Sequence, residues 1–394
     1  MLSRVCDRVM PKPEKGFEGS AMLVDKHTGQ TLSRVEKPVY EVIQPAGQAT
    51  LCNEQYHQGL LSTLETNDAD VYRLLTQEYN RQQNTLQLIA AENQCSRSVL
   101  AALGSVVQNK TTEGFVGARF HGGCEIVDCL ETLAISRARE AFDARYANVQ
   151  PHSGTSANQI VLTAILEKGD RILSLAMDQG GHVSHGAPVA LAGRIFEIES
   201  YRVRPDNFLL DYDAIREQAL RFRPRLIICG TTAYSRIIDF ARFRAIADEV
   251  GAYLMADVSH ISGLISAGVH PSPVDQAHFT TTSTYKPGGP RGGLILMGRD
   301  FDQPFPAGNK TIPLWERIEK TTFPGFQGTP YLNNIAAKAV FFKEMLSPEY
   351  KERQARIVEN AKTLAEEFVR RGYDVLTGGT DNHMCLLNVA NFRK

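Results

Sequence analysis

Cysteine is scarce and unpatterned in this chain. The 394 residues include seven cysteines and no C-x-x-C pair, which argues against both a disulfide framework and a structural zinc site. Scattered cysteines without a disulfide pattern are typical of a reducing compartment, so we expect the protein in the cytoplasm. The seven lie scattered along the sequence, at Cys6, Cys52, Cys95, Cys124, Cys129, Cys229 and Cys385.

Two other features are also missing: an excess of positive charge and a long apolar run. The 43 Lys and Arg residues nearly balance the 44 Asp and Glu residues, which removes the electrostatic reason to expect nucleic acid or an anionic membrane as a partner. No apolar run approaches the length of a membrane span, and the N-terminal stretch has no signal-peptide core. The composition therefore favours a protein that acts on small molecules.

The first part of the chain lacks a sustained hydrophobic period and combines mixed charge with scattered Gly and Pro. We interpret residues 1–66 as an N-terminal extension that is partly irregular. From Asp68 onward, apolar residues at helical spacing follow an Asn-Asp capping signal. We expect residues 67–345 to form one large domain and residues 346–394 to begin a small, truncated C-terminal α/β domain.

Short apolar segments alternate with helical patterns through most of the large domain. This alternation predicts an α/β fold with a mostly parallel sheet flanked by helices. The strand candidates are RILSLAM (171–177), LIICG (226–230), AYLMADVSH (252–260), AHFTTTST (277–284) and GLILM (293–297), and helices are expected at 239–250, 333–346 and 348–371.

Polar residues that follow parallel strands gather at one edge of the sheet, where the active sites of such folds lie. The stretch PHSGTSAN places Ser153, Gly154 and Thr155 directly before a helical pattern, where free backbone N–H groups can hold a phosphate. Taken alone, such a run is more often a plain helix N-cap.

Two further stretches carry groups with acid–base chemistry. MADVSH ends a strand candidate with Asp257 and His260; a lone Asp there is usually a turn residue, but a buried carboxylate can also keep a pyridine nitrogen protonated. DQGGHVSHG supplies His182 and His185, whose spacing allows metal ligation or the stacking of a flat ring on a planar cofactor. Because no Cys or carboxylate cluster adjoins the two histidines, stacking is at least as good an interpretation.

A single lysine, Lys286, follows a strand candidate in TTSTYKPGGPRGG. In isolation it would be a solvated loop lysine. With the phosphate cup, the imidazole and the strand-end carboxylate, it completes the set that pyridoxal 5'-phosphate needs: a phosphate site, a partner for the ring nitrogen and an amine for the Schiff base. We therefore predict a pyridoxal phosphate protein in which Lys286 holds the aldehyde, without a metal.

The sequence also resembles the serine hydroxymethyltransferase family, from about Asp68 to its last residue. The resemblance implies a fold-type I pyridoxal phosphate transferase, similar to aspartate aminotransferase, that forms a homodimer or homotetramer with sites completed across the subunit interface. It further implies retro-aldol cleavage of serine to glycine, with transfer of the one-carbon unit to tetrahydrofolate. The motifs that carry it are LQLIAAEN, NKTTEGFVGARFHGGCEIVDCLE, ANVQPHSGTSAN, GGHVSHGAPV, GTTAYSRIIDFARFRAIADEVGAYLMADVSHISGLI, KPGGPRGGLIL, FPGFQGTP and GGTDNH.

The same resemblance implies roles for the residues that match the family's motifs. Lys286 matches the Schiff-base lysine, Asp257 the partner of the pyridine nitrogen, and His182 the stacking residue. Glu113 matches the catalytic glutamate, which handles protons at the substrate hydroxyl and the folate. The other implied cofactor-binding residues are Ser153, Gly154 and Thr155 at the phosphate, Thr232 and His260 at the ring, and Gly325.

Several positions near the substrate depart from the family pattern. Thr111 and His121 replace tyrosines, Tyr285 replaces the histidine before the lysine, and the loop after Lys286 is one residue shorter. These changes leave two alternatives open: a folate-independent threonine aldolase or transaldolase, and a non-catalytic or regulatory homologue. Family members continue into a small domain with the arginine that binds the substrate carboxylate, so we expect this sequence to be a fragment or to bind its amino-acid substrate differently.

Overall fold

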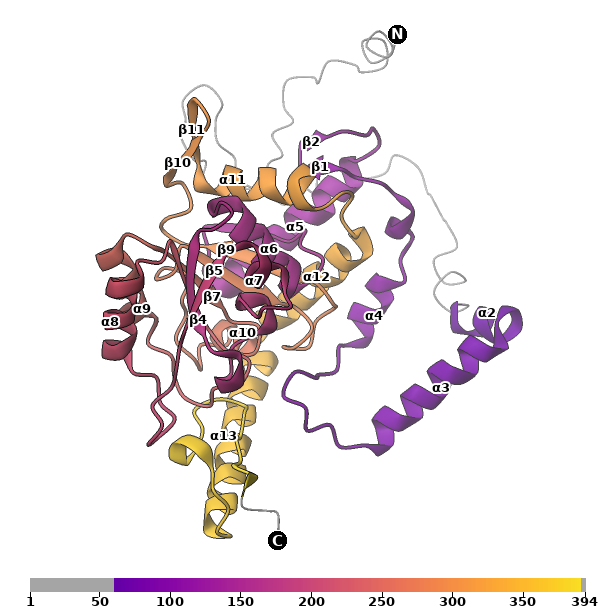
Figure 1. Ribbon diagram of the computed structural model, residues 1–394. Coiled ribbons are helices and arrows are strands. Elements are labelled where there is room, and N and C mark those ends of the chain that lie inside the picture. Colours follow the sequence, from indigo (N-terminus) through magenta and orange to yellow (C-terminus); the bar gives the residue numbers. More distant parts are fainter. Residues whose placement is uncertain (1–59, 391–394) are drawn as a thin grey trace.

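The structure is a computed structural model that describes residues 60–390 (Figure 1). Most of the expected N-terminal extension therefore lies outside the described residues. The first described residues, Leu60–Asn67, form helix α2, which the sequence pattern did not reveal. Helix α3 follows at Ala69–Asn84 and begins as predicted, since Asp68 caps it by accepting a hydrogen bond from the N–H of Val71 at 3.1 Å.

A seven-stranded sheet forms the centre of the described chain, in the order β3-β9-β8-β7-β6-β4-β5. Strands β8, β7, β6, β4 and β5 are parallel, and β9 runs antiparallel to both of its neighbours. The predicted mostly parallel α/β fold is therefore confirmed. The strands span β3 Tyr146–Asn148, β4 Arg171–Leu175, β5 Glu197–Tyr201, β6 Leu226–Cys229, β7 Tyr253–Asp257, β8 Phe279–Ser283 and β9 Gly293–Met297.

All five strand candidates from the sequence are present, but β3 and β5 were missed. The segment Tyr-Ala-Asn of β3 is too short to show a period, and Glu-Ile-Glu-Ser-Tyr of β5 is a polar edge strand. The two edges of the sheet are thus the parts that the apolar pattern did not reveal.

Each inner strand sends alternate side chains into two separate apolar cores, one on each face of the sheet. In β6, Ile227 and Cys229 belong to one core, and Leu226 and Ile228 belong to the other. The first core is covered by α5, α8, α9 and α12, and the second by α6 and α11. The helices span α5 Glu125–Phe142, α6 Gly154–Ile165, α8 Tyr212–Phe222, α9 Phe240–Val250, α11 Leu314–Lys320, α12 Leu332–Met345 and α13 Pro348–Arg370.

The remaining elements lie around this three-layer body. Two short hairpins are formed by β1 (Gly114–Phe115) with β2 (Ala118–Arg119), and by β10 (Pro304–Ala307) with β11 (Lys310–Pro313). Figure 1 shows α2 and α3 standing away from the sheet and its helices. Within the described residues, none of the helices combines the length and the apolar character needed to cross a membrane. The shorter helices are α4 Arg97–Leu103, α7 Leu191–Ile195 and α10 Ser262–Ser266.

Candidate active site

Asp257 ends the central strand β7 as a buried carboxylate surrounded by hydrogen-bond donors. Its Oδ2 atom accepts from His185 Nε2 at 2.9 Å and Asn158 Nδ2 at 2.8 Å. Its Oδ1 atom accepts from the backbone N–H and the hydroxyl of Ser259, at 3.0 and 2.6 Å. Burial alone would raise the pKa of Asp257, but these donors, His185 foremost, hold the pKa well below its usual range. Asp257 therefore stays ionised at neutral pH.

The hydrogen bonds also fix the proton positions on the two neighbouring histidines. His185 Nδ1 accepts from the backbone N–H of His182 at 3.4 Å, so the proton that faces Asp257 is on Nε2. Asn158 donates to the Ser184 hydroxyl at 2.9 Å, and this hydroxyl lies 2.7 Å from His182 Nδ1, which also accepts from the backbone of Ser184. Burial lowers the pKa of His182. His182 is thus a neutral, oriented ring with its proton on Nε2.

The environment of the two histidines differs from the sequence expectation in one respect. No carboxylate adjoins them in the sequence, but the fold brings Asp257 to them, and one ligand atom from each of the three lies within 4.8 Å of the others. Hydrogen bonds occupy Nδ1 of His182, both ring nitrogens of His185 and both oxygens of Asp257. The three therefore form a proton-holding network, and the absence of a metal stays a prediction.

The predicted phosphate cup lies at the N-terminus of α6. Ser153 caps this helix by accepting a hydrogen bond from the N–H of Ser156 at 3.0 Å, so the N-cap interpretation is confirmed. A β-carbon on Gly154 would lie only 3.1 Å from the Ser283 side chain and 3.2 Å from its backbone nitrogen. This close approach places the first turn of α6, with Thr155 exposed, directly beside the end of β8. The same turn can present N–H groups to an anion.

Lys286 lies in a tight turn directly after β8, next to this cup. Its Nζ atom donates to the Ser283 hydroxyl at 3.2 Å, and its carbonyl accepts from Asn93 Nδ2 at 3.0 Å. Gly288 closes the turn at φ +108°, a conformation that favours glycine, and donates to the carbonyl of Tyr285 at 3.0 Å. The lysine thus has a fixed backbone and a side chain directed toward the cup.

The buried polar atoms that lack a hydrogen-bond partner among residues 60–390 include the hydroxyl of Thr232 and Nδ1 of His260, which both follow strands of the sheet. Burial and the nearby Lys286 lower the pKa of His260 to about 3, so this ring is neutral. Buried polar groups are rarely left unpaired unless a ligand or water completes them. The donor set and the close-packed Gly154 therefore fit a planar, phosphorylated cofactor. The residues that the sequence assigned to pyridoxal phosphate, except Gly325, lie at the edge of the sheet where the parallel strands end.

Three of the residues assigned to the substrate, Thr111, Glu113 and His121, lie next to the β1–β2 hairpin. Tyr285, the other specificity candidate, lies instead beside Lys286, whose Nζ atom is 5.3 Å from the centre of its ring. Glu113 Oε2 lies 3.3 Å from His121 Nε2, and both side chains are about 40% exposed (39% and 40%). The Thr111 hydroxyl donates to Thr329 Oγ1 at 3.1 Å. Among the described residues, no hydrogen bond or ion pair joins Glu113 to Lys286. A further predicted cofactor residue, Gly325, is exposed and lies in the segment Thr321–Phe326.

Several polar residues that complete the network around Asp257 were not among the predicted site residues. Asn158 lies inside α6, one turn after Gly154, and Ser184 and Ser259 each lie two residues beyond a predicted site residue. The available signal was an Asn two residues before the apolar stretch 160–162 of this helix, because a buried amide usually has both its oxygen and its nitrogen paired. Asn158 meets this condition, since its Oδ1 also accepts from the Thr281 hydroxyl at 2.6 Å.

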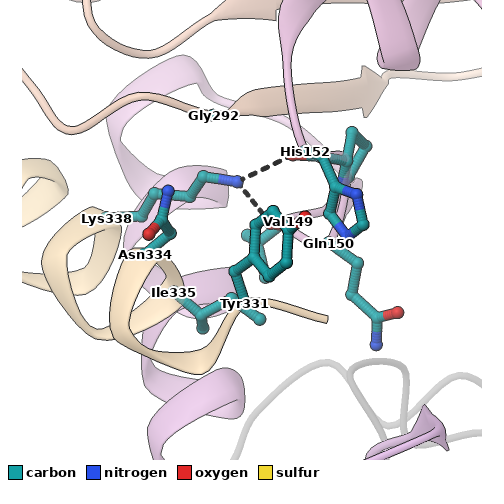
Figure 2. Close-up of a pocket in the computed structure, with 9 residues that line it drawn as sticks. Val149, Gln150, His152, Gly292, Tyr331, Asn334, Ile335 and Lys338 are labelled. Carbon is teal, nitrogen blue, oxygen red and sulfur yellow. Dashed lines mark hydrogen bonds between the residues drawn. The ribbon is translucent and has the colours of Figure 1, made fainter. Parts of the chain in front are cut away.

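Lys338 on α12 is another missed residue, and Figure 2 shows its amine reaching toward the chain around Val149. The side chain is 1% exposed, and Nζ donates to the carbonyls of Val149 (2.6 Å), Gly293 (2.8 Å) and Pro151 (3.2 Å). Beside it the ring of His152 stacks on Tyr331. Lys338 therefore holds the segment that leads from β3 into the phosphate cup.

Burial lowers the pKa of Lys338 to about 7, against an ordinary value of 10.5. The unfolded chain therefore binds more protons between pH 7 and 10, and this group makes the folded state more stable as the pH rises through that window, by at most about 1.4 kcal/mol per pH unit. We expect Lys338→Met to lose this rise of stability with pH. Urea denaturation at pH 7 and pH 9 should show the stability difference, wild type minus variant, growing with pH; a constant difference would contradict it.

Comparison with known proteins agrees with this arrangement. The family model described as serine hydroxymethyltransferase matches residues 64–393. The chain is 50% identical over 329 residues to the serine hydroxymethyltransferase of Coprothermobacter proteolyticus, covering 83% of this chain and 76% of the relative. It is 48% identical over 327 residues to the serine hydroxymethyltransferase of Nostoc punctiforme, covering 83% and 74%. Because such identity extends over most of both chains, this protein belongs to the serine hydroxymethyltransferase family.

Proposed function

We propose that this protein is a serine hydroxymethyltransferase, which cleaves serine reversibly to glycine and transfers the one-carbon unit to tetrahydrofolate. The observation that carries the proposal is an unbroken path of hydrogen bonds from Asp257 to Lys286. The Ser259 hydroxyl donates to Asp257 and accepts from the backbone N–H of Ser283 at 3.0 Å, and the Ser283 hydroxyl accepts from Lys286. The path joins a permanent negative charge to a positioned amine.

Pyridoxal phosphate, when bound, supplies the electron sink for breaking the Cα–Cβ bond of the amino acid. The ionised Asp257 is suited to keep a proton on the ring nitrogen, and the neutral ring of His182 offers a flat, oriented surface. Lys286 supplies the amine for the aldehyde and a base for protons at Cα. The remaining contacts that we propose are Ser153, Gly154 and Thr155 at the phosphate, with Thr232, His260 and Gly325 elsewhere on the cofactor.

Glu113 is proposed as the group that moves the proton at the substrate hydroxyl. Its half-exposed carboxylate lies beside His121 and is separate from the Lys286 network of the same chain. This separation supports an arrangement in which the Glu113 of one subunit serves the Lys286 of another. Tetrahydrofolate is the proposed acceptor. A reducing cytoplasm is the proposed compartment, supported by five free cysteines among the described residues.

The apolar face of α3 supports a homodimer. None of the residues of α3 is buried, although its large apolar side chains lie at helical spacing on one face. Leu74 is 57% exposed and Tyr79 is 62% exposed, and exposed faces of this kind usually mark an interface. A second copy of the chain is the occupant that we propose.

We expect the double substitution Leu74→Glu and Leu75→Glu to weaken the homodimer at least about 10⁴-fold, since the two subunits together lose four leucines and burying each is worth about 1.5 to 3 kcal/mol. Analytical ultracentrifugation of dilute holoenzyme measures the shift. Asn80→Glu, on the polar face of the same helix, is the control and should leave the assembly unchanged. A wild-type protein that sediments as a single chain would contradict the proposal.

The function itself is tested by following glycine and aldehyde production from serine with and without tetrahydrofolate. We expect tetrahydrofolate to raise serine turnover at least about tenfold, which corresponds to about 1.4 kcal/mol of activation free energy. Serine turnover at the same rate with and without tetrahydrofolate would favour the aldolase alternative. No turnover of either serine or threonine by protein loaded with pyridoxal phosphate would favour a non-catalytic homologue.

The substitutions at Thr111 and His121 support a second activity, folate-independent cleavage of threonine. Threonine needs room for one methyl group more than serine, and a pocket discriminates such a group by only about 1 to 3 kcal/mol. Smaller side chains beside Glu113 reduce that discrimination. We expect threonine cleavage without folate at a rate comparable to folate-dependent serine turnover. Restoring the family residues with Thr111→Tyr and His121→Tyr should lower the threonine-to-serine ratio; an unchanged ratio would reject the role of these positions.

A further inference from the structure

Arg119, at the end of the β1–β2 hairpin, is a buried arginine that the proposed function does not use. Its side chain is 4% exposed. Nε donates to Asp128 at 2.8 Å, and Nη2 donates to Glu131, which is itself 1% exposed. Burial alone would lower the pKa of Arg119, but Glu131 and Asp128 outweigh burial and raise it. The guanidinium is thus a permanently charged group anchored on α5.

The remaining end of this guanidinium holds the backbone on both sides of Glu113. Nη1 donates to the carbonyl of Thr112 at 3.0 Å and to the carbonyl of Gly114 at 2.7 Å. The carbonyl of Glu113 itself accepts from the backbone N–H of Phe120 at 3.0 Å. Three consecutive carbonyls are therefore fixed, while the Glu113 side chain remains 39% exposed and free to meet a substrate.

A second side chain ties the same loop to the central sheet. Gln150 follows β3, and its Nε2 atom donates to the carbonyl of Gly114 at 3.0 Å and to Glu131 at 2.8 Å. Gln150 lies three residues before Ser153. The loop that carries Glu113 is thus connected to the segment that leads into the phosphate cup.

We propose that Arg119 is a positioning residue that sets the direction of the Glu113 carboxylate, an inference that rests on the proposed role of Glu113. The planar guanidinium directs five N–H groups in a fixed fork, so it binds two carboxylates and two carbonyls at once. A lysine retains the charge but has three donors on one atom and cannot span all four acceptors. The charge compensates the two acids, and the fork geometry fixes the loop.

Arg119→Lys in the full-length holoenzyme tests the geometry while keeping the charge. We expect kcat for serine to fall about 10²-fold with KM changed less than about threefold, because displacing a catalytic group by about 1 Å costs that much. Arg244→Lys is the matched control. Arg244 is also largely buried, bridges Asp248 and Asp300 and donates to the carbonyl of Gln276, but it lies near the opposite end of β7, so kcat should be unchanged.

A double-variant cycle separates positioning from a structural role. In the Glu113→Gln background, Arg119→Lys should cause no further loss of kcat, since the group it orients is already disabled. An equal loss in both backgrounds would overturn the inference. Full kcat in Glu113→Gln alone would instead overturn the proposed role of Glu113, and the positioning role with it.

A readout independent of turnover is amide hydrogen exchange across residues 112–121. Exchange should accelerate in Arg119→Lys and stay at the wild-type rate in Arg244→Lys. Unchanged exchange in Arg119→Lys would contradict the proposal that Arg119 fixes this loop. If Arg119→Lys does not fold, Gln150→Met replaces it, because this change removes one of the two donors to the Gly114 carbonyl and one donor to Glu131 without altering any charge. The expected loss of kcat is then about three- to tenfold, again absent in the Glu113→Gln background.

Discussion

Replacing Lys286 with alanine is expected to reduce serine turnover about 10³-fold or more. The substitution removes both the amine that holds the cofactor aldehyde and the base nearest to Cα, and each of these roles is worth orders of magnitude in rate. The fold should be intact, because within residues 60–390 Lys286 Nζ makes one hydrogen bond, to the Ser283 hydroxyl, and one ring contact, with Tyr285, while the turn is held by its backbone. Steady-state kinetics with a saturating cofactor concentration measures the loss.

Borohydride treatment of the wild-type protein should attach the cofactor to the peptide that contains Lys286, and peptide mapping identifies the modified residue. Lys310→Ala, on the exposed strand β11, is the matched lysine control and should retain full turnover. A cofactor fixed on another lysine, or an alanine variant with near wild-type kcat, would reject Lys286.

Asp257→Asn is expected to lower kcat about 10²- to 10³-fold while the protein stays folded. An amide carries no charge, so it cannot hold a proton on a pyridine nitrogen as a carboxylate does, and each pKa unit lost by that nitrogen corresponds to about 1.4 kcal/mol. The new amide group would face the N–H donors of His185 and Asn158, which costs about 1 to 3 kcal/mol of stability. Kinetics and urea denaturation measure the two effects separately.

The control for this variant is Asp213→Asn, since Asp213 is 86% exposed and pairs with Arg242 at the surface. Removing such a pair changes stability by about 1 kcal/mol or less and should leave kcat unchanged. If Asp257→Asn turns over serine at the wild-type rate, the carboxylate does not act on the cofactor and the assignment fails.

Local sequence signals predicted the inner part of the fold well. Residues 293–297 were predicted as a strand and form β9, and the helix predicted at 348–371 is α13 at Pro348–Arg370. The Asp68 cap was also visible, because a helix start depends on side chains within about three residues. Helix α2 was not predicted, because its eight residues are too few to show a period.

The candidate residues Lys286, Asp257 and His182 were visible because each follows an apolar strand candidate or lies in a glycine-bordered loop of distinctive composition. The hydrogen bonds that join distant segments of the chain were not visible. Asn158 and Asp257 are 99 residues apart in the sequence, and Lys338 and Val149 are 189 residues apart. No periodicity links positions that distant.

The sequence by itself determined which segments become strands and helices, and which chemical groups follow them, because those features depend on neighbours a few residues away. Only the tertiary structure decided that Asp257 accepts four hydrogen bonds, from a helix, a loop and its own turn. It also decided that Arg119 donates hydrogen bonds to the backbone on both sides of Glu113. These contacts depend on the strand order β3-β9-β8-β7-β6-β4-β5, which arises when strands pair across long loops and bury two apolar faces together.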